Sequence, residues 1–74
     1  MATDAEWQAK AKNLVKAELK RRGVSYAQLA EKLREIGVHD SERNISNKLS
    51  RGSFTAVFLL QVMEAIGAKD LRLP

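Results

Sequence analysis

The chain has 74 residues and a mass of 8.3 kDa, with 13 basic and 9 acidic side chains and a formal net charge of +4. A chain this short has room for one core, so we expect a single domain over residues 1–74. It contains no cysteine and one histidine, which excludes disulfides, a thiol nucleophile and multi-histidine metal clusters, and no apolar run approaches the roughly 18 residues that span a bilayer.

Four evenly spaced glycines, at positions 23, 37, 52 and 67, divide the chain. Glycine enters the left-handed conformation that ends helices, so this spacing predicts four helices. We place them at about residues 4–22, 26–36, 41–51 and 54–66, followed by a tail over 68–74. Strand alternation and hairpin signals are missing from the sequence. The prediction is a compact all-α domain, with the tail as a candidate fifth helical turn.

The first two predicted helices each begin with a capping box, Thr3 with Glu6 and Ser25 with Gln28. Apolar residues recur on one face of each, as expected for amphipathic helices. The predicted buried residues are Trp7, Ala11, Leu14, Val15 and Leu19 in the first helix, and Tyr26, Leu29, Ala30, Leu33 and Ile36 in the second.

Asp40 or Ser41 is expected to cap the third helix, and Ser53 or Thr55 the fourth. The fourth helix is apolar on nearly every side, which indicates a central position or burial by another chain. Its candidates for the core or for a dimer interface are Phe54, Val57, Phe58, Leu60, Val62 and Met63.

The positive charge is concentrated in two segments, residues 10–22, where Glu18 is the one acid, and residues 43–51, which contain no acid. Such asymmetry is typical of a protein that binds a polyanion, although a solvated helix face has the same appearance. Glu18 falls on the apolar side of its helix. We expect it to contact Arg22, and a bridge to a base of the third helix is the alternative.

The third helix is the most informative segment. Ile45 and Leu49 define its inward direction, so the opposite arc carries donor-rich side chains. They are Arg43, Asn44, Asn47, Ser50 and Arg51, with Ser46 and Lys48 on the flanks. Arginine recognises guanine and asparagine recognises adenine through two hydrogen bonds, and serine or lysine suits phosphates. Asparagine and serine are poor helix formers, so their number here favours a binding role over a marginal polar surface helix.

Three segments together resemble the lambda-repressor-like helix-turn-helix domain over roughly residues 14–68: Lys20–Ala30 (KRRGVSYAQLA), Ile45–Gly52 (ISNKLSRG) and Glu64–Gly67 (EAIG). The whole chain also resembles a small bacterial family described as a domain of unknown function, through Glu18–Arg21 (ELKR) and Asn47–Gly52 (NKLSRG).

The repressor-like resemblance implies that residues 25–37 form a positioning helix and that residues 41–51 form a recognition helix in the major groove. The implied base-contacting residues are Arg43, Asn44, Ser46 and Asn47. The implied phosphate contacts are Gln28, Lys48, Arg51 and Ser53, to which the basic first helix adds Lys16 and Lys20.

Two features depart from the repressor pattern. The stretch from Leu29 to Ile45 is about five residues too long, so either the second helix gains a turn or the connecting turn becomes a loop. Leu19 and Leu49 also occupy positions where such domains often carry a buried ion pair. Packed leucines can replace a buried ion pair without loss of stability.

These observations predict a cytoplasmic, nucleoid-associated bacterial transcriptional regulator that binds double-stranded DNA as a homodimer, without metal, cofactor, membrane or enzymatic activity. The alternatives are a protein-interaction module that dimerises through the fourth helix and an RNA-binding protein. His39, beside Asp40 and Glu42, is better suited to a turn or cap than to a metal site.

Overall fold

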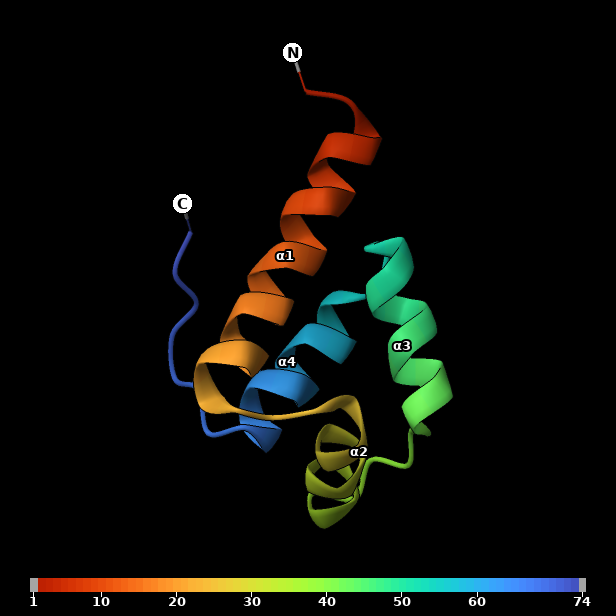
Figure 1. The fold of residues 1–74 in the computed structure, drawn as a ribbon, viewed down its shortest axis with the longest axis vertical. Helices are drawn as coiled ribbons and strands as arrows, with labels where there is room; N and C mark the ends of the chain where they lie inside the picture. Colours follow the sequence, from red (N-terminus) through yellow and green to blue (C-terminus); the bar gives the residue numbers. More distant parts are fainter. Residues whose placement is uncertain (1, 74) are drawn as a thin grey trace.

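A computed structural model describes residues 2–73. It contains four helices, α1 (Asp4–Arg22), α2 (Tyr26–Glu35), α3 (Glu42–Arg51) and α4 (Ala56–Ala65), and no strand within those residues (Figure 1). The prediction of an all-α fold with four helices is therefore confirmed. Residues 68–73 form no helical turn, so the expectation of a fifth was wrong.

Each helix begins at a side-chain cap. Thr3 and Ser25 form the two expected capping boxes with Glu6 and Gln28. Ser41 rather than Asp40 caps α3, and its hydroxyl accepts the amide hydrogen of Asn44. Thr55 caps α4 in the same way through the amide of Phe58. Local hydrogen bonds that the sequence specifies thus define all four starting points.

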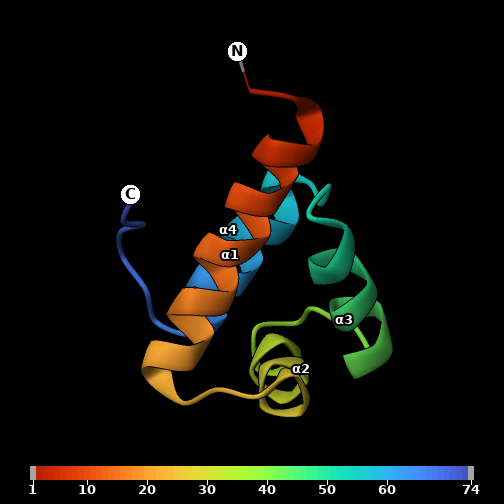
Figure 2. The ribbon, with the colours of Figure 1, turned by 45° about the horizontal axis from the view of Figure 1, so that its top comes forward.

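The core lies where α2, α3 and α4 meet the C-terminal half of α1. Its largest fully buried side chains come from all four helices: Val15, Leu29, Leu33, Ile45, Leu49 and Val62. Figure 1 shows α2 nearly end-on and the C-terminal end of α3 beside the N-terminal half of α1, and Figure 2 shows α4 behind α1. The molecule measures 40 × 23 × 20 Å, and its length comes from α1, whose 19 residues extend beyond the other helices.

Two long-range contacts hold α1 in place. Gly52, which ends α3 with φ +71°, lies so close to α1 that a Cβ atom there would collide with the backbone carbonyl of Gln8. At the other end, Arg22 donates from Nη1 to the carbonyl oxygen of Ile66 at 3.2 Å and so caps the C-terminus of α4. Together they fix α1 against both α3 and α4.

The buried carboxylate Glu18 holds that arginine. It is 4% exposed and accepts hydrogen bonds from Arg21 at 2.6 Å and from Arg22 at 3.5 Å. The expected contact with Arg22 is confirmed. The alternative bridge to α3 is not formed.

The structure corrects two predicted core residues. Trp7 is 58% exposed, although its neighbour Gln8 lies against Gly52 at the end of α3. Ile36 is 42% exposed. Ile36 is the C-cap of α2, and Gly37 follows it with φ +83° and turns the chain. The amide of Val38 then donates to the carbonyl of Leu33 at 2.9 Å, and Val38 packs against the core instead of Ile36.

The connection between α2 and α3 spans residues 36–41. The extra residues between Leu29 and Ile45 lie in a longer loop and not in an extra turn of α2, which has 10 residues. The shorter turn of the repressor pattern is therefore absent here, and nothing in the fold identifies it as helix-turn-helix in type.

Candidate nucleic-acid interface

α3 has two sharply different faces. Ile45 and Leu49, on the inward face, are 0% exposed. The outward face carries exposed polar side chains, namely Arg43, Asn44, Asn47, Ser50 and Arg51, while Ser46 and Lys48 are half-buried at its edges. We call these seven residues the α3 face. Their angular distribution agrees with the one derived from the sequence.

Most of the α3 face has no partner inside the protein. Within residues 2–73, Lys48 is the one residue of this face whose side chain forms a hydrogen bond or ion pair. The guanidinium groups of Arg43 and Arg51 and the amides of Asn44 and Asn47 are therefore available to an external ligand. Two guanidiniums and two amides offer donors and acceptors of the kind that recognise base edges.

Lys48 has a different environment from the one predicted. Its Nζ donates to Oδ2 of Asp40 at 2.7 Å, and it lies 4.7 Å from the centre of the Phe58 ring. The Asp40 side chain is 12% exposed, so this ion pair anchors the long α2–α3 loop to α3. A phosphate would have to compete with Asp40 for Lys48. Sequence reasoning treated Asp40 as a helix cap and missed the pair, since no local pattern links two residues at this separation.

A small hollow brings together three of the predicted phosphate contacts, Lys48, Arg51 and Ser53. Its volume is about 240 Å³, and Phe54, Thr55 and Phe58 complete the lining. It lies at the N-terminus of α4, where unpaired amide hydrogens and the helix dipole favour an anion. The first turn of α4 contains no acidic residue that would oppose this.

Gln28 is positioned by its capping box. Its Oε1 accepts the amide hydrogen of Ser25 at 2.9 Å, and the residue is exposed. The acceptor end of the side chain is therefore fixed against the protein, which leaves the Nε2 hydrogens to donate outward. Donation to a phosphate is within the capacity of this group.

The six basic residues of α1 have different surroundings. Lys10 places its Nζ 5.0 Å from the centre of the Trp7 ring. Arg21 and Arg22 are paired with Glu18. The lysines at 12, 16 and 20 form a row with helical spacing, about 12 Å long, and none of them forms an ion pair within the described residues. Lys16 and Lys20 are exposed and Lys12 is half-buried. α1 packs against α3.

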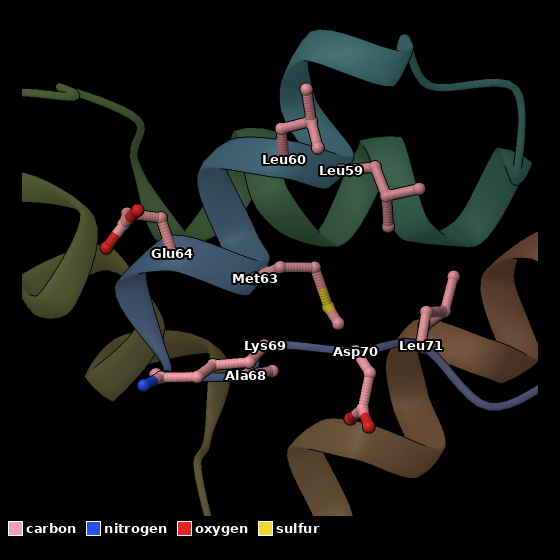
Figure 3. A pocket seen from close by; sticks show the side chains of 9 residues that line it. Leu59, Leu60, Met63, Glu64, Ala68, Lys69, Asp70 and Leu71 are labelled. Atoms are coloured by element: carbon pink, nitrogen blue, oxygen red, sulfur yellow. The ribbon is translucent and has the colours of Figure 1, made fainter.

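The candidate interface residues of α4 separate into core and surface. Phe58, Val62 and Met63 are buried, and half-buried Phe54 packs edge-to-face on Phe58 with ring centres 5.5 Å apart. Val57 and Leu60 are 62% and 69% exposed. Beside Leu60, a groove of about 640 Å³ runs between α4 and the tail (Figure 3). Only Val57 and Leu60 among the six are open to a partner.

Among residues 2–73 there is no grouping of three histidine, cysteine or carboxylate side chains able to hold a metal ion. His39 is exposed in the α2–α3 loop, and its neighbour Asp40 is already paired with Lys48. Over the same residues, none of the helices combines the length and the apolar character needed to cross a membrane.

A family model matches most of the chain. The model of DUF6471, described as a domain of unknown function, covers residues 7–71. The chain belongs to this family. No curated protein and no solved structure matches the chain. The predicted likeness to a family of unknown function is thus confirmed, and the matched DUF6471 region includes all of α2, α3 and α4.

Proposed function

We propose that this DUF6471 protein binds double-stranded DNA, with α3 in the major groove, and acts as a transcriptional regulator. The observation that carries the proposal is the α3 face, on which arginine and asparagine side chains are exposed and free of internal partners over two buried aliphatic residues. Poor helix formers retained on an exposed face, with donors and acceptors matched to base edges, support recognition of sequence.

Phosphate contacts are assigned to the surroundings of α3. Arg51 and Ser53, at the hollow beside the N-terminus of α4, would bind one phosphate, and Lys48 would join them if it exchanges Asp40 for the ligand. Gln28 and the lysines at 16 and 20 would bind others. Arg43, Asn44, Ser46 and Asn47 are assigned to base edges. A net charge of +4, concentrated on α1 and α3, supports binding to a polyanion.

A single domain of this size reads few base pairs. Two copies on adjacent half-sites would supply the specificity that a regulator needs, so we propose that the protein acts as a homodimer. Such a role places it in the cytoplasm, at the nucleoid.

Duplex binding is tested by fluorescence anisotropy with a labelled duplex of about 20 base pairs, titrated at several salt concentrations. Arg43→Gln should weaken binding about tenfold or more, because it removes a charge and two donors from the α3 face. Arg34→Gln is the matched control, since Arg34 is also an exposed arginine, on α2. Its affinity should stay within about twofold of the parent chain. Equal losses in both variants would refute the assignment to α3.

Base recognition needs a second measurement. A preferred site is first selected from a pool of random duplexes. Asn47→Ala should then lose about 1–3 kcal/mol of discrimination at one base pair of that site. Lys16→Ala should weaken binding to all sequences alike and reduce the salt dependence by about one phosphate. If Asn47→Ala instead lost affinity equally for all duplex sequences, α3 would contact phosphates and not bases.

The second candidate function is a protein-interaction module. It is favoured by α4, which exposes Val57 and Leu60 and contains no basic residue. A chain that assembles with protein, independently of salt, and does not bind duplex DNA would support it. Binding to structured RNA in preference to the duplex would indicate the third alternative, because a basic surface serves both ligands.

A further inference from the structure

The groove between α4 and the tail has an apolar floor and a charged rim. Leu59, Met63, Ala68 and Leu71 form the floor, and Leu60 stands at its upper edge (Figure 3). Glu64 and Lys69 lie together at one end. The side chain of Met63 reaches from α4 toward the tail and divides the space only partly. The groove is therefore an apolar recess with three charged residues around it, Glu64 and Lys69 at one end and Asp70 on the tail.

The same face also presents the projections that would fill such a recess. Leu60 is 69% exposed and Val57, three residues earlier on the same helix, is 62% exposed. A two-fold axis places the same patch of both partners in contact, so a surface with a projection beside a recess is complementary to itself. With antiparallel α4 helices, Leu60 of each copy would enter the groove of the other.

Charge also favours a second copy over other partners. A net charge of +4 repels another copy from most of the surface, but α4 contains no basic residue. Within the described residues, Glu64 and Lys69 form no ion pair. In a two-fold pair, Glu64 of one copy can face Lys69 of the other, and the contact occurs twice. These two contacts between Glu64 and Lys69 are complementary in charge, while Asp70 leaves one further acidic residue on the rim of each copy.

We propose that this groove is the dimer interface of the protein, occupied by Leu60 of a second copy. The inference deepens the proposed function, because it assigns to a surface the homodimer on which that function relies. α4 is about 15 Å long, so we expect the contact to lie at the small end of specific interfaces. The free protein is then a weak dimer in equilibrium with its monomer.

The test is sedimentation equilibrium of the full chain, without DNA, from about 1 μM to about 500 μM. The mass should rise from 8.3 kDa toward twice that value. Leu60→Glu should weaken dimerisation about tenfold or more, because it places a carboxylate in an apolar recess. Leu73→Glu is the matched control, since Leu73 is 74% exposed, lies outside the groove and receives the same change in charge.

A charge exchange tests the rim. Glu64→Lys alone should weaken the dimer, because it opposes two basic groups across the axis, and adding Lys69→Glu should restore it. Circular dichroism verifies that each variant is folded. A parent chain that stays monomeric over the whole range, or equal effects of Leu60→Glu and Leu73→Glu, would overturn the proposal.

The outcomes for dimerisation and for DNA binding are separable. If the chain dimerises through α4 but binds no duplex, the interface stands and the proposed function fails. If Leu60→Glu and the parent chain dimerise equally while Arg43→Gln still loses duplex affinity, the interface fails and the DNA site stands.

Discussion

Gly52→Ala should lower the stability of the protein far more than the addition of one methyl group usually does. Gly52 has φ +71° at the end of α3, and a Cβ atom there would collide with the carbonyl of Gln8 in α1. Because backbone cannot move aside like a flexible side chain, α1 and α3 must separate. Gly23→Ala is the matched control, since Gly23 has φ +66° with nothing within 4 Å of its Cβ position.

The two substitutions share the penalty for the left-handed conformation, about 1–2 kcal/mol. Gly52→Ala adds the overpacking of the α1–α3 contact, about 1–3 kcal/mol more. A domain of this length has a free energy of unfolding of about 4–11 kcal/mol, so the added loss is a large fraction of it. At about 4–8 °C per kcal/mol, Gly52→Ala should melt roughly 4–24 °C below Gly23→Ala.

Thermal unfolding followed by circular dichroism, at one low protein concentration for both variants, gives the comparison directly. Urea unfolding provides the free energies at constant temperature. Equal melting temperatures for the two variants would show that α1 and α3 are not in close contact at this point. That result would also remove the support by which α1 holds the α3 face in position.

Two further substitutions test the ion pairs. Lys48→Met leaves the carboxylate of Asp40 largely buried without a partner and should lower the free energy of unfolding by about 1–3 kcal/mol in urea titrations. Adding Asp40→Asn should recover part of this loss. A double variant no more stable than Lys48→Met would argue against the ion pair. Glu18→Gln removes the negative charge that faces Arg21 and Arg22 and leaves one amide oxygen as acceptor in place of two carboxylate oxygens, so urea unfolding should show a loss of about 1–2 kcal/mol. A variant as stable as the parent would mean that the buried charge gives no net stabilisation.

The sequence was sufficient for features that depend on near neighbours. Capping boxes at Thr3 and Ser25 involve residues three apart, and the inward positions of Ile45 and Leu49 follow from helical periodicity alone. The composition of the α3 face followed from that same periodicity. Local hydrogen bonding and burial agree at these sites, so the local pattern was enough.

What the sequence could not provide depends on where elements end in space. Trp7 continues the apolar face of α1, but periodicity does not tell which positions of that face other elements cover, and Trp7 is left 58% exposed. Ile36 falls just before a glycine that turns the chain, so Val38 and not Ile36 packs against the core. The contacts of Gly52 with Gln8 and of Lys48 with Asp40 join different elements, so no short spacing announces them.

Amide chemical-shift perturbation on the full chain, with a short duplex added at low salt, tests the role of α3 most directly. Binding through the α3 face predicts that the largest shifts fall on residues 43–51, with smaller ones at Gln28 and Ser53. Shifts confined to α4 and the tail, or none at a saturating concentration of duplex, would contradict it.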